Sequence, residues 1–296
     1  MTTPNSKTKS PSTPAPSSSA IKRLRNICAF IFDMDGTLVL GDKTNHGLNP
    51  LPGAREMIAH LNKQNLPYVL FTNGTALTPV AYVETLRRIG FDLPGNAVLT
   101  PASVAADLFV EKGYRRILAL GTEGMTKSLA DAGLEILKPE GKPTADAVLI
   151  GWFREFTMPA LESACYAAWN GAKVYSCSQS LFFATAEGKT LGTSRAIAAM
   201  IRDLTGAKIH LVGKPDIAAL RCASYRLNVA TKHIAVVGDD PALEVPMAHR
   251  GKSLAIAVQT GIGAADSFKH LKKSQHPHIA IHDVGELLSL YIGQNA

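Results

Sequence analysis

Short apolar runs alternate with longer amphipathic stretches along most of the chain, and this alternation predicts the fold. Short apolar runs bounded by turn residues suit buried strands, and the longer stretches between them have helical periodicity. The core strands are expected at 28–32, 68–71, 209–212, 234–237 and 254–258, followed by an edge strand at 279–281 and a helix at 284–291. Strands that alternate with helices favour an α/β fold class, here a doubly wound, Rossmann-like parallel sheet.

A second alternation of helices and strands interrupts this pattern in the middle of the chain. Helices are expected at 79–89, 101–111, 124–132, 158–170 and 194–204, and strands at 117–120, 147–150 and 173–176. Gly, Pro and Thr cluster at both junctions of this segment, as is typical of domain boundaries. We therefore expect a core domain at 21–76 and 207–296, with an inserted α/β domain at 77–206.

The first 20 residues are rich in Ser, Thr, Pro and Lys and have almost no large apolar side chains. They cannot bury enough surface to offset the entropy of ordering, so a disordered tail is expected. Transit peptides are also Ser-rich and poor in acid, but arginine is absent before Arg23 and no amphipathic helix is evident, which favours a plain solvated tail. No apolar run approaches the roughly 18 to 20 residues that a membrane-spanning helix needs, so we expect a soluble protein with no membrane partner.

Charge and cysteine content narrow the function classes. The formal net charge is +7, and five of the positive charges lie before residue 26, so the folded part is only mildly basic. This excess fits an anionic substrate, and no basic run interleaved with aromatic residues indicates a nucleic-acid partner. The cysteines, at positions 28, 165, 177 and 222, have neither metal-ligand nor disulfide-framework spacing. Reduced thiols in the cytoplasm are therefore expected.

Polar residues of complementary chemistry follow four of the expected strands. The segments are Asp33-Met34-Asp35-Gly36-Thr37, Thr72-Asn73-Gly74-Thr75, Gly213-Lys214-Pro215-Asp216 and Gly238-Asp239-Asp240. Ligands of open parallel α/β sheets bind outside the carboxyl ends of the strands, where these four segments would converge. Each segment alone is a common turn or helix start, but together they indicate one functional site.

The residue types in these segments suit phosphoryl transfer. Asp33 can attack phosphorus, while Asp35 can protonate the leaving oxygen and later take a proton from water. The Thr72 hydroxyl and nearby backbone amides can hold phosphate oxygens. Lys214 supplies a cation, and Pro215 suits the first turn of the next helix. The carboxylates after the fourth strand could ligate Mg²⁺, which prefers oxygen ligands.

The chain resembles the haloacid dehalogenase-like (HAD) hydrolase superfamily from about Ile27 to near the C-terminus. The matching segments are Phe32 to Leu38, Leu51 to Ala54, Phe71 to Gly74, Val212 to Pro215 and Val237 to Asp239. The distance from Thr72 to Lys214 is similar to that in subclass IIA, the NagD-like and p-nitrophenyl phosphatase-like group. In that subclass a large α/β cap domain lies between the second and third motifs, so the inserted domain is expected to be a cap that governs substrate specificity.

The resemblance implies specific catalytic roles. Asp33 would form an aspartyl-phosphate, and Asp35 would be the general acid and base. Thr72, Asn73 and Gly74 would hold the transferring phosphoryl group, with Lys214 neutralising charge.

The resemblance also implies a cofactor and an assembly. Mg²⁺ would be bound by Asp33, the backbone carbonyl of Asp35 and Asp239. The protein would form a homodimer through the cap.

The sequence departs from the family pattern at two places. Glu244 stands where a second metal-site aspartate is usual, and its longer side chain would reach Mg²⁺ through a water molecule. After the strand at 173–176, Ser178, Gln179 and Ser180 occupy the place where related phosphatases have Thr-Asn-Pro-Asp or a near variant. They form either a substrate-facing loop or an ordinary connection, and the polar loop at 43–49 is likewise either a gate to the site or a simple connection.

The sequence therefore predicts a Mg²⁺-dependent phosphatase. Its substrate would be a small phosphomonoester metabolite such as a sugar phosphate, a nucleotide monophosphate or a cofactor phosphate. A phosphotransferase or mutase of the same superfamily could use the same residues. A catalytically weak phosphometabolite-binding protein is the alternative outside the enzymes, and the substitution at Glu244 keeps it open.

Overall fold

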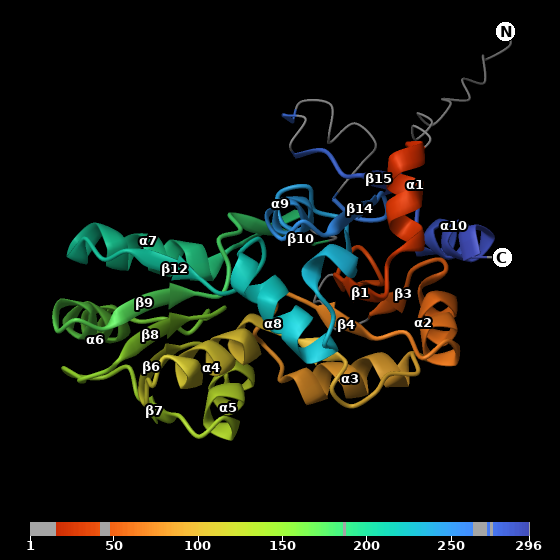
Figure 1. The fold of residues 1–296 in the computed structure, drawn as a ribbon. Coiled ribbons are helices and arrows are strands. Elements are labelled where there is room, and N and C mark those ends of the chain that lie inside the picture. Colours follow the sequence, from red (N-terminus) through yellow and green to blue (C-terminus); the bar gives the residue numbers. More distant parts are fainter. Residues whose placement is uncertain (1–15, 42–47, 186–187, 263–270, 273–274, 296) are drawn as a thin grey trace, which may run out of the picture.

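The computed structural model describes residues 16–41, 48–185, 188–262, 271–272 and 275–295. Most of the expected N-terminal tail and most of the polar loop at 43–49 lie outside these ranges. Figure 1 shows two α/β units side by side, the first containing both chain ends and the second formed by the middle of the chain. Within the described residues, no helix is both long and apolar enough to cross a bilayer.

The first unit is built on a six-stranded parallel sheet with the order β15-β14-β13-β1-β4-β5. Its strands are β1 (Ala29–Phe32), β4 (Tyr68–Phe71), β5 (Val98–Leu99), β13 (Ile234–Gly238), β14 (Leu254–Val258) and β15 (Ile279–Ile281). Every residue of β1 is buried, as expected for a strand with helices on both faces. This sheet confirms the α/β, doubly wound core.

Helices cover both faces of the first sheet. The helices α1 (Ser18–Arg25), α2 (Ala54–Lys63), α3 (Pro79–Arg88) and α10 (Val284–Asn295) contribute to one apolar cluster, and α8 (Ile217–Leu227) and α9 (Glu244–Arg250) to the other. Alternate residues of β1 divide between the clusters, because successive side chains of a strand point to opposite faces. Phe30 and Phe32 belong to the first cluster and Ile31 to the second.

The second unit is a five-stranded parallel sheet with the order β12-β9-β8-β6-β7. Its strands are β6 (Arg116–Leu120), β7 (Glu135–Leu137), β8 (Ala147–Ile150), β9 (Lys173–Ser176) and β12 (Ile209–Leu211). The helices α4 (Pro101–Glu111) and α5 (Glu123–Asp131) pack on one face, and α6 (Met158–Trp169) and α7 (Thr193–Thr205) on the other. This sheet is the expected inserted α/β domain, and we call it the cap.

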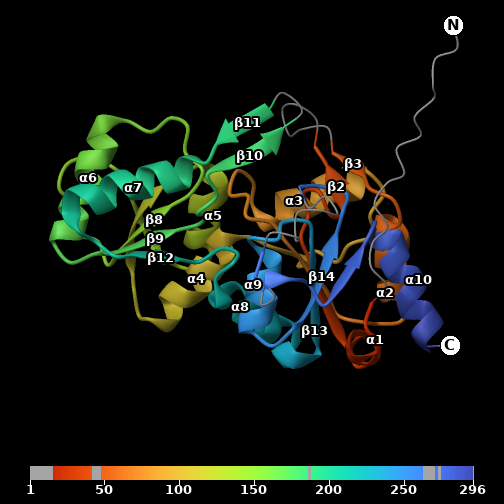
Figure 2. The same cartoon turned by 90° about the horizontal axis from the view of Figure 1, so that it is seen from above.

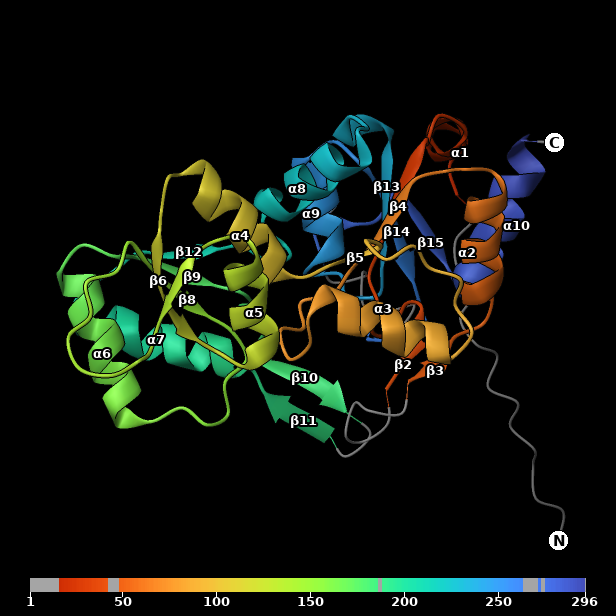
Figure 3. The ribbon, with the colours of Figure 1, turned by 90° about the horizontal axis from the view of Figure 1, so that it is seen from below.

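Two antiparallel pairs complete the fold. The pair β2 (Val39–Leu40) and β3 (Asn49–Pro50) belongs to the first unit, and the hairpin of β10 (Phe182–Thr185) and β11 (Gly188–Leu191) extends from the cap. Figures 2 and 3 show both pairs on the same side of the molecule, near the junction of the two units.

The sheet pairing differs from the expected domain boundaries at both junctions. Val98–Leu99 lies within the range expected for the cap, yet it pairs with β4 in the core sheet. Ile209–Leu211 was expected as a core strand, yet it pairs with β9 at the edge of the cap sheet. The apolar pattern predicted a strand at 209–212 but did not specify its partner, and it gave no strand at 98–99.

Two local expectations are also corrected. Ser18 to Ala20 were assigned to the disordered tail, but they begin helix α1, where Ser17 Oγ accepts a hydrogen bond from Ala20 N at 3.2 Å. Pro215 was expected in the first turn of a helix. It instead precedes the N-cap residue Asp216 of α8 and follows Lys214 through a cis peptide bond.

The segment before α2 brings two helices of the core together. Gly53 has a φ of +74°, and a Cβ added to it would lie 2.1 Å from the Cα of Gly285 in α10. Neither backbone can give way cheaply, so the contact requires glycine at position 53.

We therefore expect Gly53→Ala to lower the free energy of unfolding by more than about 1 kcal/mol, through both the positive φ and the clash. Gly95→Ala is the matched control, because nothing lies within 4 Å of its added Cβ, and it should change stability by less than about 0.5 kcal/mol. Urea unfolding curves measure the free energy of unfolding of both variants. Equal stability of the two variants would contradict the packing argument.

Candidate active site

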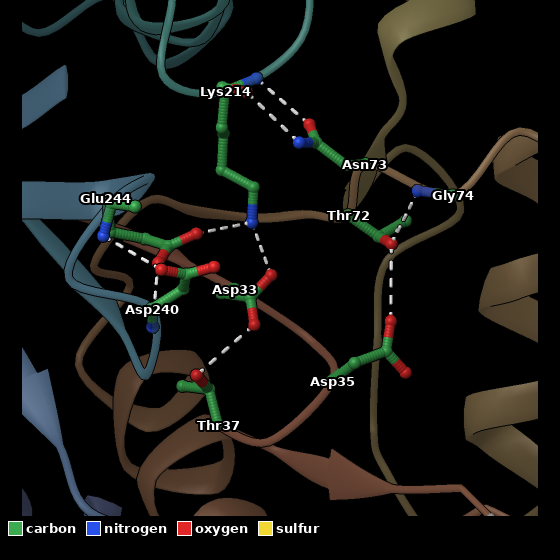
Figure 4. A network of polar contacts seen from close by, with 10 residues as sticks. Asp33, Asp35, Thr37, Thr72, Asn73, Gly74, Lys214, Asp240 and Glu244 are labelled. Atoms are coloured by element: carbon green, nitrogen blue, oxygen red, sulfur yellow. Dashed lines mark hydrogen bonds and ion pairs between the residues drawn. The ribbon is translucent and has the colours of Figure 1, made fainter. Parts of the chain in front are cut away.

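The four polar segments meet at the junction of the two units (Figure 4). Asp33 follows β1, Thr72 follows β4 and Asp239 follows β13, so these three side chains come from the carboxyl ends of core strands. Lys214 comes instead from the segment after β12, at the edge of the cap sheet. The site is therefore assembled from both sheets.

Lys214 forms a buried ionic cluster with two carboxylates. Its Nζ donates to Asp33 Oδ1 and lies 2.7 Å from Glu244 Oε1. Lys214 is 1% exposed and Asp33 is 7% exposed, so water screens these contacts very little. Burial alone would lower the pKa of Lys214, but the charges of Asp33 and Glu244 outweigh burial and raise it. The lysine therefore stays an ammonium ion against the Asp33 carboxylate.

The sequence predicted a water-mediated contact between Glu244 and a metal. In the structure, the neighbour of Glu244 is Lys214. Glu244 begins α9, is 2% exposed, and directs one carboxylate oxygen to Lys214. Its other oxygen, Oε2, accepts a hydrogen bond from Asp240 N at 3.2 Å. The structure thus shows Glu244 as a second anionic partner of the lysine, while its contact with a metal stays a prediction.

Asp35 and Thr72 are joined by a hydrogen bond. Thr72 Oγ1 donates to Asp35 Oδ2 at 3.4 Å. Desolvation by the surrounding protein, followed by the like charge of Asp33, raises the pKa of Asp35 to about 6. The charge of Lys214 and the hydrogen bond from Thr72 oppose this rise. The Asp35 side chain itself is exposed, so solvent screens part of these effects. A carboxyl group with a raised pKa suits a proton donor.

Asn73 was expected to hold phosphate, but its side chain is used differently. The Nδ2 group donates to the carbonyl oxygen of Lys214 at 3.1 Å, and Oδ1 accepts from Lys214 N at 2.9 Å. Both hydrogen-bonding groups of the amide are therefore bound to the main chain of the lysine. Gly74 N likewise donates to Thr72 Oγ1 at 2.9 Å, so it already has a partner within the loop.

Asp239 lies against the backbone of Gly36, where only glycine fits. Its Oδ2 accepts from Ile262 N at 2.7 Å, and a Cβ added to Gly36, where φ is +83°, would lie 2.4 Å from the same oxygen. Burial, then the charges of Asp33 and Glu244, raise the pKa of Asp239 to about 8. Within the described ranges, no three His, Cys, Asp or Glu side chains gather into a metal-holding group.

The motif loop after β4 is also bound to the strand ends of the cap. Thr75 is 1% exposed, and its Oγ1 accepts from Trp152 N, just after β8, at 2.9 Å. Its carbonyl oxygen accepts from Thr122 Oγ1, just after β6, at 3.0 Å. The carboxyl ends of the cap strands therefore approach the phosphate-motif loop of the core.

The loop at Ser178, Gln179 and Ser180 is held by internal hydrogen bonds. Ser178 is 3% exposed, and its Oγ accepts from Ser180 N at 3.2 Å. Arg195 Nη1 donates to the carbonyl oxygen of Gln179 at 2.8 Å. Arg195 thus fixes the loop, and contact between this loop and a substrate stays a prediction.

Three neighbours of the site were missed in the sequence. Thr37 Oγ1 donates to Asp33 Oδ2 at 3.3 Å, and Thr260 Oγ1 donates to the carbonyl oxygen of Gly36 at 2.6 Å. Tyr82 Oη would lie 2.4 Å from a Cβ added to Gly74. Tyr82 lies in α3 and Thr260 follows β14, so only the fold brings them here. Thr37 lies within the first motif, and its spacing from Asp33 was the one available signal.

Comparisons with known proteins identify the family of the chain. Residues 30–135 match the family description "Haloacid dehalogenase-like hydrolase", and residues 211–287 match a HAD-hydrolase-like family. The acid sugar phosphatase of Staphylococcus saprophyticus is 26% identical over 266 residues, which cover 90% of this chain and 98% of that protein.

Two solved structures share the fold over most of the chain. The 4-nitrophenylphosphatase of Thermotoga maritima has a TM-score of 0.81 and 29% identity, over 90% of this chain and 98% of that one. NagD of Escherichia coli K-12 has a TM-score of 0.77 over 88% of this chain and 98% of that one, and at 23% identity it supports the fold alone. The family matches thus cover both parts of the motif set, and the solved structures cover both sheets. The chain belongs to the HAD-like hydrolases, as a phosphatase of the NagD-like subclass IIA.

Proposed function

We propose that this phosphatase hydrolyses a small phosphomonoester in a Mg²⁺-dependent reaction, through an aspartyl-phosphate on Asp33. The observation that carries the proposal is the buried contact of Asp33 with Lys214, beside Asp35. A carboxylate held next to a cation, with a proton donor close by, has what a phosphoryl transfer in two steps requires.

In the first step, an oxygen of Asp33 attacks phosphorus and the ester P–O bond breaks. Asp35 gives its proton to the departing alkoxide oxygen, which leaves as the alcohol. In the second step, water attacks phosphorus, Asp35 takes a proton from that water, and the bond between phosphorus and Asp33 breaks. Inorganic phosphate leaves, and Asp33 is again a carboxylate.

Other residues position the phosphoryl group. Lys214 compensates the negative charge that gathers on Asp33 and the phosphoryl oxygens. The Thr72 hydroxyl and the backbone N–H of Asn73 are the proposed donors to those oxygens. The Thr72 hydroxyl would exchange its hydrogen bond to Asp35 for one to the phosphoryl group, and Gly74 would join only by exchanging its hydrogen bond to Thr72. The Asn73 side chain acts by fixing the main chain of Lys214.

The donor set fits Mg²⁺. Asp33, Asp239 and the backbone carbonyl of Asp35 would hold the ion, which needs few protein ligands because it keeps several waters. The raised pKa of Asp239 results from burial beside Asp33 and Glu244, and a cation there would relieve this repulsion. When bound, the ion supplies positive charge to the phosphoryl oxygens.

The similar proteins support the substrate class. Relatives are named acid sugar phosphatase and 4-nitrophenylphosphatase, so a sugar phosphate is the first substrate to test among small phosphorylated metabolites. Transfer to an alcohol acceptor, as in a phosphotransferase or mutase, has no observation in its favour here.

We also propose a homodimer formed through the cap. Several large apolar side chains of the cap are exposed, namely Leu181, Leu191, Met200 and Leu204. Leu191 and Met200 line a cavity of about 360 Å³ together with Trp152, Phe153 and Phe156. Exposed apolar surface of this kind is typical of protein interfaces. A cytoplasmic location without nucleic-acid partners stays a prediction of the sequence.

The nucleophile can be tested by Asp33→Asn, which replaces the attacking carboxylate by an amide of the same shape. Phosphate release from sugar phosphates and from 4-nitrophenyl phosphate should fall by at least about a thousandfold, with the fold retained by circular dichroism. Asp203→Asn, at an exposed position, is the matched control and should keep full activity. Turnover by the Asp33 variant near the wild-type rate would rule out this nucleophile.

The role of Asp35 can be tested with two leaving groups. Asp35→Asn should slow hydrolysis of an alkyl phosphate by about 10² to 10⁴, because an alkoxide needs a proton to leave. The 4-nitrophenolate ion leaves without one, so this variant should still release it in a burst while the aspartyl-phosphate, lacking its general base, persists. Equal losses for both substrates, without a burst, would argue against acid and base catalysis by Asp35.

Metal dependence can be tested by removal and return of the ion. Chelator should abolish phosphate release by the wild type, and excess Mg²⁺ should restore it. Mg²⁺ should also raise the melting temperature of the wild type, but not that of Asp239→Asn, which lacks one proposed ligand. Full activity in chelator would contradict the proposal.

A further inference from the structure

A basic pocket lies at the opposite end of the core sheet from the candidate active site. Its volume is about 450 Å³, and it is lined by Arg23, Lys232, His249, Lys252, Ser253 and His278. Ser253 directly precedes β14, His278 precedes β15, and Lys232 lies in the short helix before β13. These are the amino ends of the parallel strands, whereas Asp33 and Asp239 lie at carboxyl ends. The pocket is therefore a separate place in the molecule.

Positive charge in this pocket is not compensated by carboxylates. None of the lining residues is acidic, and in the part of the chain that the structure describes no carboxylate pairs with Arg23, Lys232 or Lys252. Arg23 Nη2 instead donates to the carbonyl oxygen of Lys252 at 3.2 Å, which places the two cationic residues side by side. Three cations around one hollow repel one another unless an anion lies between them.

The imidazoles add a neutral hydrogen-bond donor. His278 Nδ1 accepts from Ala255 N at 2.9 Å, so in the neutral ring the proton is on Nε2. Burial, followed by the charges of Arg23 and His249, lowers the pKa of His278 to about 4, which keeps the ring neutral at physiological pH. Its Nε2–H is therefore a donor that does not depend on protonation.

The walls of the pocket are fixed before any ligand arrives. Ser253 is fully buried and donates to the carbonyl oxygen of Thr231 at 2.7 Å. His249 Nε2 lies 2.8 Å from the carbonyl oxygen of His276, and its ring centroid lies 4.6 Å from that of His278. Lys252 has a φ of +61°, a conformation uncommon for residues other than glycine. Ser253 and His249 thus keep the shape of the pocket through bonds to carbonyl oxygens, and the exposed side chains of Lys232 and Lys252 remain to meet an anion.

We propose that this pocket binds a phosphate group, either as inorganic phosphate or as part of a small phosphorylated molecule, at a site separate from the catalytic one. A phosphate dianion matches several cations better than a singly charged carboxylate does, and its tetrahedral oxygens accept from guanidinium, ammonium and imidazole donors at once. For a phosphatase, such a site would respond to its own product or to other phosphorylated molecules.

The proposal can be tested by isothermal titration calorimetry on the full chain with Asp33→Asn as the background, so that esters are not hydrolysed. The probes are inorganic phosphate and glycerol phosphate, which separate free phosphate from a phosphomonoester as the ligand. The pocket variant is Lys232→Gln with Lys252→Asn, because asparagine tolerates the positive φ at position 252. Lys63→Gln with Lys112→Gln changes the net charge equally at exposed positions away from the pocket.

With at least one probe, the Asp33→Asn background protein should show two binding sites. The control variant, Lys63→Gln with Lys112→Gln, should show the same two sites. The pocket variant should show one unchanged site and a second weakened at least tenfold. The same Lys232 and Lys252 substitutions in the protein with Asp33 intact should leave the turnover of saturating 4-nitrophenyl phosphate within twofold when no other phosphate is added. One site in the background protein with both probes, two unchanged sites in the pocket variant, or equal weakening in the control would each overturn the proposal.

Discussion

The contact of Lys214 with Asp33 is the interaction on which the rest of the site depends. The lysine follows an edge strand of the cap sheet, whereas the aspartate follows the central β1 strand of the core. Both charges are almost fully removed from water, and an unpaired buried ammonium would be strongly destabilising. The pair therefore requires the two sheets to meet at this point. Glu244 adds a second carboxylate beside the lysine, and together with Asp33 it raises the pKa of the ammonium.

The junction that holds this pair is fixed by backbone contacts as well as by charge. Asn73 binds both main-chain groups of Lys214, and Thr75 connects the same loop to Trp152 and Thr122 of the cap. One apolar cluster includes side chains of both sheets, with α4 packed between them. A movement of the cap relative to the core would have to keep these contacts or break them together. The segments that connect the two units are thus held together by hydrogen bonds on either side of Lys214.

The sequence predicted which segments meet at the site better than it predicted which strands pair. The order of apolar runs and polar strand ends identified Asp33, Asp35, Thr72, Lys214 and Asp239 as neighbours, and the structure brings these segments together. Strand partners were less predictable, because Val98–Leu99 and Ile209–Leu211 are too short for their pattern to indicate which sheet they join. Side-chain direction was not predictable either. Asn73 follows a phosphate motif, yet the fold places a lysine backbone beside its amide.

Glu244 shows why a change in a motif is better judged from its neighbours than from the motif alone. Judged from the sequence alone, the extra methylene of Glu244 weakened the expected metal site. The alternative of a catalytically weak binding protein therefore stayed open. In the structure, the longer side chain reaches Lys214 at 2.7 Å while its second oxygen accepts from Asp240 N. The charge of a buried glutamate in this place is compensated by the Lys214 ammonium. The glutamate at this position is therefore compatible with the proposed catalysis, because its carboxylate contacts the lysine that is paired with the proposed nucleophile.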